Sequence, residues 1–292
     1  MTELTRIDLA TGVSLDVQLL GDPAHPPVIL LHGFPESHRT WRTVAPDLAR
    51  DHFVIAPDQR GYARSSKPEG VASYAPEKIV GDMIALADHL GLARFALVGH
   101  DWGGAIAWMA ALRHSDRVAR LVICNAPHPL VFQRALFADP EQRRHSQYIT
   151  RFRDPDIDAT LASDGYEEFF RWAFGQYDPS QVTAEDKAAY LDEWRQPGAM
   201  TAMLNWYRAS PIVVPPQDAT PAPPAWLDAP FPPIAMPTLV VWGLQDKALL
   251  PGQLEGLDAL VPDLTVVRVP GAGHFLPWED GAAVVKAMRE WL

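Results

Sequence analysis

The hydrophobic pattern of the chain alternates between short apolar runs and longer segments in which apolar residues recur at helical spacing. An uninterrupted apolar run flanked by turn residues is typical of a strand buried on both faces of a parallel sheet. Residues 3–20, where apolar and polar positions alternate around Thr11-Gly12, instead predict a hairpin. Helices are predicted at 41–49, 76–90, 251–260 and 280–292, and buried strands at 27–31, 53–56, 95–98, 118–124, 238–242 and 264–269.

The alternation is interrupted once, between residues 127 and 237. This stretch lacks a strong strand pattern and ends in a proline-dense segment, 211–237, which favours an extended tether because proline fixes the backbone and lacks an N–H. We therefore expect an α/β fold with a mostly parallel central sheet flanked by helices and a helical cap inserted after the sixth strand. The expected core is 1–127 with 237–292, the expected cap with its tether is 128–236, and the cap helices are predicted at 131–137, 167–174, 183–194 and 199–209.

Composition narrows the classes of function. With 48% hydrophobic and 21% charged residues, the chain is typical of a soluble globular protein, and its net charge of −11 disfavours nucleic acid and anionic membranes as partners. Cys124 is the only cysteine and lies in an apolar run, so no intrachain disulfide or cysteine-based metal site is expected. The first residues show no signal pattern and no apolar window is long enough to span a membrane, so we expect a cytoplasmic protein.

The segment Gly99-His100-Asp101-Trp102-Gly103-Gly104 joins the strand predicted at 95–98 to a helical pattern of small residues. Small residues on both sides of a nucleophile are typical of a nucleophile elbow, a sharp strand-to-helix turn. The central residue is Asp101, where serine is usual. An ionised carboxylate attacks saturated carbon without a base and forms an ester that water can cleave, whereas serine would form an ether without a carbonyl. Asp101 therefore indicates substitution at alkyl carbon, as in epoxide opening or carbon–halogen cleavage.

Two further groups follow in the order that such an elbow predicts, which is an acid after a later strand and a histidine near the C-terminus. Asp246 follows the seventh predicted strand region and His274 lies in the loop after the last strand. Both positions are beyond the carboxyl ends of strands, where the functional groups of open α/β sheets lie. We expect Asp246 to orient His274, which takes a proton from water, and the backbone N–H groups of Phe34 and Trp102 to form an oxyanion hole.

Over nearly its whole length the chain resembles the epoxide hydrolases of the α/β-hydrolase fold. Besides the elbow, the segments that carry this resemblance are His32-Gly33-Phe34-Pro35-Glu36-Ser37, Asp58-Gln59-Arg60-Gly61-Tyr62 and Asn125-Ala126-Pro127-His128-Pro129. We expect a reaction without cofactor or metal, with a small-molecule epoxide and water as partners and with a monomer or homodimer as the functional unit.

The resemblance extends to the cap, where residues 147–152 and 204–208 are similar to the family's two ring-opening segments. It implies that Tyr148 and Tyr207 donate to the epoxide oxygen, a role that suits a phenol because it can hydrogen-bond and protonate a developing alkoxide. It also implies that Glu36 positions the hydrolytic water or relays its protons. His32 is expected to support the turn that carries the oxyanion hole.

Other interpretations fit part of the pattern. Asp101 alone also fits a capping residue at a helix start, and Glu36 fits a surface position. A dehalogenase would use the same nucleophile, but haloalkane dehalogenases often have asparagine where Phe34 stands, and fluoroacetate dehalogenases have arginines where this chain has Trp102 and Ala105. A non-catalytic hydrolase-like binding protein would be expected to have a broken triad.

Overall fold

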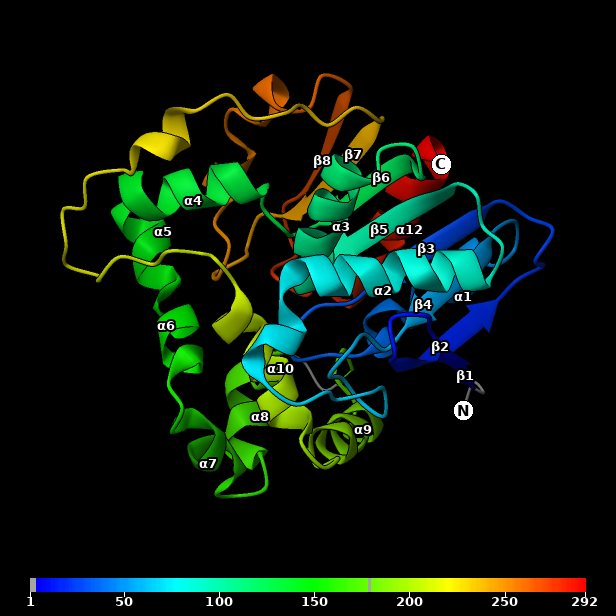
Figure 1. Ribbon diagram of the computed structural model, residues 1–292, viewed down its shortest axis with the longest axis horizontal. Coiled ribbons are helices and arrows are strands. Elements are labelled where there is room, and N and C mark those ends of the chain that lie inside the picture. Colours follow the sequence, from blue (N-terminus) through cyan, green and yellow to red (C-terminus); the bar gives the residue numbers. More distant parts are fainter. Residues whose placement is uncertain (1–3, 178–179) are drawn as a thin grey trace.

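A mostly parallel sheet runs through the centre of the computed structural model, which describes residues 4–177 and 180–292 (Figure 1). The strands in these residues are β1 Thr5–Asp8, β2 Ser14–Leu20, β3 Pro27–Leu31, β4 Phe53–Pro57, β5 Phe95–His100, β6 Val118–Cys124, β7 Thr238–Gly243 and β8 Leu264–Val269. They form one sheet in the order β1-β2-β4-β3-β5-β6-β7-β8. β2 pairs antiparallel with β1, as the predicted hairpin requires, and with β4, and the remaining pairs are parallel. The sheet predicted from the apolar runs is confirmed.

The uninterrupted apolar runs arise because the central strands are covered on both faces. In β3, Val28 and Leu30 point into one core and Ile29 and Leu31 into the other, and all four are buried. Burial of a side chain of this size contributes about 1.5–3 kcal/mol. The first core is shared with α1 Ala45–Leu48 and α12 Gly281–Trp291, the second with α2 Pro76–His89 and α3 Trp102–Arg113, and α11 Leu276–Glu279 precedes α12.

The helices between β6 and β7 lie to one side of the sheet, at the left and bottom of Figure 1. Residues 211–237 then return to β7 without a strand or α-helix and contain one 3₁₀ turn, Ala225–Asp228. Among the helices of the described residues, none combines the length and the apolar character needed to cross a membrane. The inserted helices are α4 Pro129–Ala138, α5 Pro140–His145, α6 Gln147–Arg153, α7 Ile157–Ala162, α8 Glu167–Phe174, α9 Ala184–Trp194 and α10 Ala199–Ala209.

Helix α9 attaches these inserted helices to the segment that follows β3. The Tyr190 hydroxyl donates to Glu36 Oε1 at 2.8 Å, and the Trp194 indole N–H donates to the Pro35 carbonyl at 2.7 Å. Arg39 and Glu193 add an ion pair with an N–O distance of 3.0 Å. Two of these contacts are buried, where hydrogen bonds are costly to break, so α9 is held firmly against residues 35–39.

Several predicted helices differ from the structure. The helix predicted at 41–49 is a 3₁₀ turn, His38–Trp41, followed by α1, because Pro46 lacks the N–H that a continuous helix would need. The helix predicted at 251–260 is two 3₁₀ turns, Pro251–Leu254 and Leu257–Ala259, separated by Gly256 in the left-handed region (φ +69°). Helices α5, α6 and α7 are too short for helical periodicity to reveal, and they were not predicted.

The start of α3 lies directly against the end of β3, and Gly103 makes this contact possible. A Cβ atom at residue 103 would collide with the carbonyl oxygens of Leu31 and His32. The close packing brings residue 101, at the junction of β5 and α3, next to the turn that begins at His32. The glycine pattern of the elbow therefore determines how near the nucleophile lies to this turn.

We expect Gly103→Ala to lower the free energy of unfolding by about 1–3 kcal/mol, because the added methyl group would force two backbone segments apart. Urea denaturation measures this loss. Gly252→Ala is the matched control, since a Cβ atom there meets nothing within 4 Å. For this control we expect a change within about 0.5 kcal/mol. If Gly103→Ala were as stable as the wild type, the close packing of α3 on β3 would be contradicted.

Candidate active site

Asp101 occupies the turn between β5 and α3. Its backbone has φ +50° and ψ −121°, a conformation that residues other than glycine rarely adopt. Its carboxylate makes no capping hydrogen bond to α3, so the interpretation of Asp101 as a helix cap is wrong. Instead, Oδ1 accepts the backbone N–H of Phe34 at 2.8 Å. Gly33 allows this approach, because a Cβ atom at that position would collide with the Asp101 side chain.

His274 reaches Asp101 from the loop after β8. Its Nε2 lies 3.6 Å from Asp101 Oδ2, and its Nδ1 lies 2.9 Å from Oδ2 of Asp246. Asp246 follows β7 and is only 3% exposed. The structure thus brings the three residues together in the order Asp101, His274, Asp246, with the imidazole between two carboxylates.

The orientation of Asp246 depends on Asn125, which the sequence analysis did not single out as a site residue. Asn125 Nδ2 donates to Asp246 Oδ2 at 2.8 Å, and its Oδ1 accepts the Gly243 N–H at 2.8 Å. The other oxygen of Asp246 accepts the N–H groups of Ala248 and Leu249. Asn125 has φ +40°, a conformation that asparagine tolerates, and this position at the end of β6 is the signal that could have identified it.

The two carboxylates set the charge of the histidine. Burial by itself would lower the pKa of His274, but the charges of Asp246 and Asp101 outweigh it and hold this pKa well above its usual value. Burial by itself would raise the pKa of Asp101, and the nearby His274 outweighs it so that the carboxyl pKa is lowered. In this state Asp101 is an ionised carboxylate beside an imidazolium.

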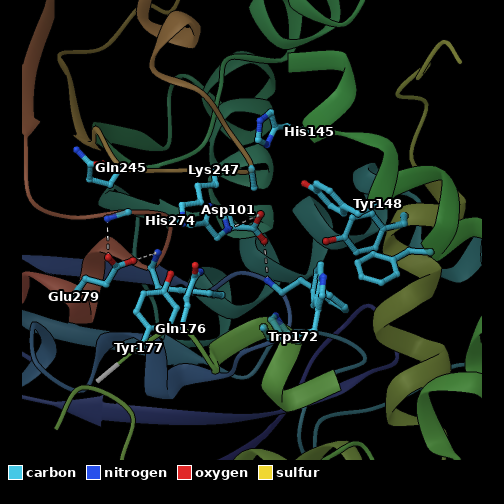
Figure 2. Close-up of a pocket in the computed structure, with 18 of the residues that line it drawn as sticks. Asp101, His145, Tyr148, Trp172, Gln176, Tyr177, Gln245, Lys247, His274 and Glu279 are labelled. Carbon is cyan, nitrogen blue, oxygen red and sulfur yellow. Dashed lines mark hydrogen bonds and ion pairs between the residues drawn. The ribbon is translucent and has the colours of Figure 1, made fainter. Parts of the chain in front are cut away.

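Tyr148 on α6 and Tyr207 on α10 face this group from the inserted helices. Their ring centroids are 6.1 Å apart, and the Tyr207 ring lies 5.0 Å from those of Phe34 and Trp102. Figure 2 shows Tyr148 on the far side of Asp101 from His274. Burial, reinforced by the charge of Asp101, raises the pKa of both phenols above the ordinary value, so both hydroxyls keep their protons.

A single cavity of about 660 Å³ joins these groups. Asp101 and His274 line it, and a volume of this size suits a small organic molecule. Much of the wall is aromatic, contributed by Phe34, Tyr148, Phe152, Trp172, Tyr177, Tyr207 and Phe275. In the part of the chain that the structure describes, no three His, Cys, Asp or Glu side chains are grouped so that they could hold a metal ion.

His32 and Glu36 flank the turn that carries Phe34. His32 is buried, and burial lowers its pKa to about 4, so it is neutral. Its Nε2 accepts the Gln59 N–H at 3.0 Å, which leaves the Nδ1 proton for the Gly33 carbonyl at 2.9 Å. Glu36 is 2% exposed, so a surface position is wrong for it. Its Oε1 accepts from Tyr190 and from the Trp278 indole, and burial raises its carboxyl pKa.

His100 lies between Glu36 and the loop that carries His274. Its Nε2 lies 2.7 Å from the His274 carbonyl, which can only accept, so Nε2 carries the proton. Its Nδ1 is 3.9 Å from Glu36 Oε2. Burial, followed by the nearby charge of His274, lowers the pKa of His100 to about 4. His100 is therefore a neutral residue that fixes the main chain of the base.

The family model described as the alpha/beta hydrolase fold matches residues 26–145 and 141–281 of this chain. The AB hydrolase superfamily protein YfhM of Bacillus subtilis (strain 168) is 34% identical over 284 residues, covering 96% of this chain and 95% of that protein. Epoxide hydrolase A of Mycobacterium tuberculosis is 32% identical over 321 residues, covering 96% of this chain and 94% of that protein.

Solved structures give the same result. One of the epoxide hydrolases from metagenomes of hot environments superposes with a TM-score of 0.90 at 47% identity, covering 99% of this chain and 98% of that chain. The resemblance drawn from the motifs and the expected fold are both confirmed. The chain therefore belongs to the α/β-hydrolase fold family and is related, over nearly its whole length, to the epoxide hydrolases of that family.

Proposed function

We propose that this chain is an epoxide hydrolase, which adds water to an epoxide and releases a vicinal diol through an ester on Asp101. The observation that carries this proposal is the position of the Asp101 carboxylate. It lies between an imidazole on one side and two phenols on the other, in one cavity. A carboxylate nucleophile, a base for the hydrolysis of its ester and acids for the leaving oxygen are the three groups that the reaction needs.

In the first step, Asp101 Oδ2 attacks one epoxide carbon. The carbon–oxygen bond of the ring breaks, its electron pair moves to the ring oxygen, and Tyr148 or Tyr207 delivers a proton to that oxygen while the other phenol donates a hydrogen bond. Oδ2 is the attacking atom because Oδ1 is held by the Phe34 N–H. Oδ1 then becomes the carbonyl oxygen of the ester.

In the second step, His274 takes a proton from water and the resulting hydroxide attacks the carbonyl carbon of the ester. Negative charge develops on Oδ1, which already faces the Phe34 N–H, and the Trp102 N–H is the second donor of the oxyanion hole. The tetrahedral intermediate then collapses by breaking the bond between the carbonyl carbon and Oδ2. Oδ2 leaves on the substrate carbon and takes the proton from His274, so the diol is released. The carboxyl group left on Asp101 contains the water oxygen, and loss of its proton restores both the carboxylate and the phenol that protonated the ring oxygen. Glu36 positions the hydrolytic water or relays its protons, and His32 supports the turn.

Formation of the ester prepares His274 for this second step. The free site contains two carboxylates that raise the pKa of the imidazole. When Asp101 becomes an ester it loses its charge, so one of the two negative charges that raise the pKa of His274 is removed. The pKa of His274 then falls, so a larger fraction of the imidazole is neutral and able to act as a base.

Residues 128–236 form the lid of this site, inserted into a core of 1–127 and 237–292. The lid contributes both phenols and much of the aromatic wall, while the core contributes the nucleophile, the base and the oxyanion hole. We propose that the protein works without cofactor or metal in the cytoplasm, as a monomer or homodimer, with a small-molecule epoxide and water as its partners.

The decisive variant is His274→Gln, incubated with styrene oxide. We expect diol release to fall by more than about 10²-fold, because the base of the second step is missing, while Asp101 is still alkylated. Mass spectrometry should show the mass of one substrate molecule on the peptide that contains Asp101, and none in Asp101→Ala. Undiminished turnover by His274→Gln would contradict the scheme. Parallel assays with fluoroacetate and a haloalkane should release no halide, and halide without diol would indicate a dehalogenase.

The double variant Tyr148→Phe/Tyr207→Phe tests the acids. We expect the rate of ester formation to fall by about 10²–10⁴-fold, because no proton reaches the ring oxygen, while the fold persists. Stopped-flow kinetics measures this step. Tyr166→Phe is the control, since Tyr166 is a half-buried tyrosine of the lid outside the cavity, and its rate should stay within about twofold of the wild type. Retained epoxide opening in the double variant would assign the proton to another donor.

Asp101→Asn imitates the uncharged ester and tests the change in the histidine. We expect the pKa of His274 to be lower than in the wild type, because one of two neighbouring negative charges is removed. NMR titration of the imidazole ring measures it. His128 is an internal reference, because its pKa of about 4 is set by burial and by Arg134 and should not move. An unchanged His274 pKa would show that the charge of Asp101 does not act on the base.

A further inference from the structure

Glu279, the last residue of α11, turns its carboxylate back under the loop that carries His274 (Figure 2). Its Oε2 accepts the N–H of Gly273 at 2.6 Å, and its Oε1 accepts the N–H of Phe275 at 2.7 Å. One carboxylate therefore binds the main chain immediately before and immediately after the base. Hydrogen bonds from N–H groups to an ionised carboxylate are about twice as strong as those between neutral groups.

The fit between this carboxylate and the loop is close. A Cβ atom at residue 273 would lie 3.2 Å from Oε2 and 3.3 Å from Oε1 of Glu279, so any side chain there would require the carboxylate to move by a few tenths of an ångström. The N–H of Glu279 also donates back to the carbonyl of Phe275 at 3.0 Å. The loop and α11 thus form a closed unit that carries His274 at its centre.

The lid covers the outer side of the same unit. The Phe174 ring lies 5.0 Å from that of Phe275, and the Tyr177 ring lies 5.0 Å from that of Trp278. Burial, followed by the charge of Glu279 and a hydrogen bond to its side chain, raises the pKa of the Tyr177 phenol. Glu279 is therefore where the lid, the base-carrying loop and α11 meet.

The main chain at His274 needs such support in the second step, because once Asp101 is an ester Asp246 is the one carboxylate that still holds the ring. Asp246 fixes the direction of Nδ1, and His100 holds the His274 carbonyl. His100 holds the peptide group after residue 274 by its oxygen alone, and the Ala272 carbonyl accepts the Gln245 N–H at 2.8 Å, so the N–H groups of Gly273 and Phe275 are left for Glu279 to bind. A shift of the loop would move Nε2, which must stay within one water molecule's reach of the ester carbon on Asp101.

We propose that Glu279 is a positioning residue for the second half of the reaction, holding the backbone at Gly273 and Phe275 so that His274 can activate water against the Asp101 ester. It acts through the backbone and not on the substrate. The inference rests on the proposed function, because it presupposes the ester. Ester formation uses Asp101 and the two phenols, so Glu279 should matter little for the first step and greatly for the second.

The test separates the two steps in single-turnover experiments with styrene oxide. For Glu279→Ala we expect ester hydrolysis to slow by about 100-fold, the usual effect of misplacing a reacting group by about 1 Å, while ester formation stays within about threefold of the wild type. The ester should then accumulate on Asp101 as an added mass. Glu279→Gln keeps one acceptor oxygen, so it should slow hydrolysis by about 10-fold and thus restore part of the activity. If Glu279→Ala does not fold, the rates of ester formation and ester hydrolysis in Glu279→Gln alone test the inference.

Asp280→Ala is the matched control. The neighbouring carboxylate of Asp280 caps α12 by accepting the Ala283 N–H at 3.0 Å and makes no contact with the loop amides. This variant should lose stability without changing the ratio of the two rate constants. Equal slowing of both steps in the Glu279 variants, or no accumulation of ester, overturns the inference while leaving the proposed function intact. A wild-type chain that forms no diol would instead contradict the proposed function.

Discussion

The site depends on one close approach, between the Asp101 side chain and the backbone of Gly33 and Phe34. A left-handed backbone at Asp101 turns the carboxylate toward the end of β3, and the absence of a side chain at residue 33 lets it reach the Phe34 N–H. The packing of Gly103 against Leu31 holds the two strand ends at this spacing. A nucleophile that is already bound through one oxygen presents the other to the substrate and meets the oxyanion donor before any charge develops.

The charges of these groups determine the protonation states on the two sides of the cavity. On the core side, two carboxylates lie next to one imidazole in a buried region. The carboxylates favour the charged form of His274, and His274 favours the charged form of Asp101. On the lid side, burial and the charge of Asp101 keep both phenols protonated. The charge of the Asp101 carboxylate therefore raises the pKa of both phenols and of His274, so it favours the protonated form of all three groups. In the proposed reaction, conversion of this carboxylate to an ester lowers the pKa of His274 after the phenols have acted.

The sequence alone was enough to predict two kinds of feature: strands, each of which is one apolar segment, and the triad, whose three residues occur in a fixed order along the chain. Uninterrupted apolar runs located the parallel strands because these strands are buried on both faces, and the order of Asp101, Asp246 and His274 located the triad because each follows a strand. Glu36 was placed near the turn, but its burial depends on Tyr190 and Trp278, which are distant in sequence. Asn125 stands at the end of β6, but its partners Asp246 and Gly243 are distant in sequence, and the contacts of Glu279 with the Gly273 and Phe275 amides depend on how the loop turns into α11, so residue type alone could not assign a role to either.

The glycines around the nucleophile also limit how this protein can diverge. Any side chain at Gly33 or Gly103 would collide with neighbouring atoms, so these two positions next to the nucleophile tolerate little besides glycine. Apart from Tyr148 and Tyr207, the wall supplied by the inserted helices includes side chains with more room, such as Trp172, which is 55% exposed beside the cavity. Lineages that acquire new preferences among substrates, or opposite handedness of product, should therefore differ in the lid and keep the glycines beside Asp101. Directed evolution of substrate preference should likewise change residues of the lid and leave these glycines unchanged.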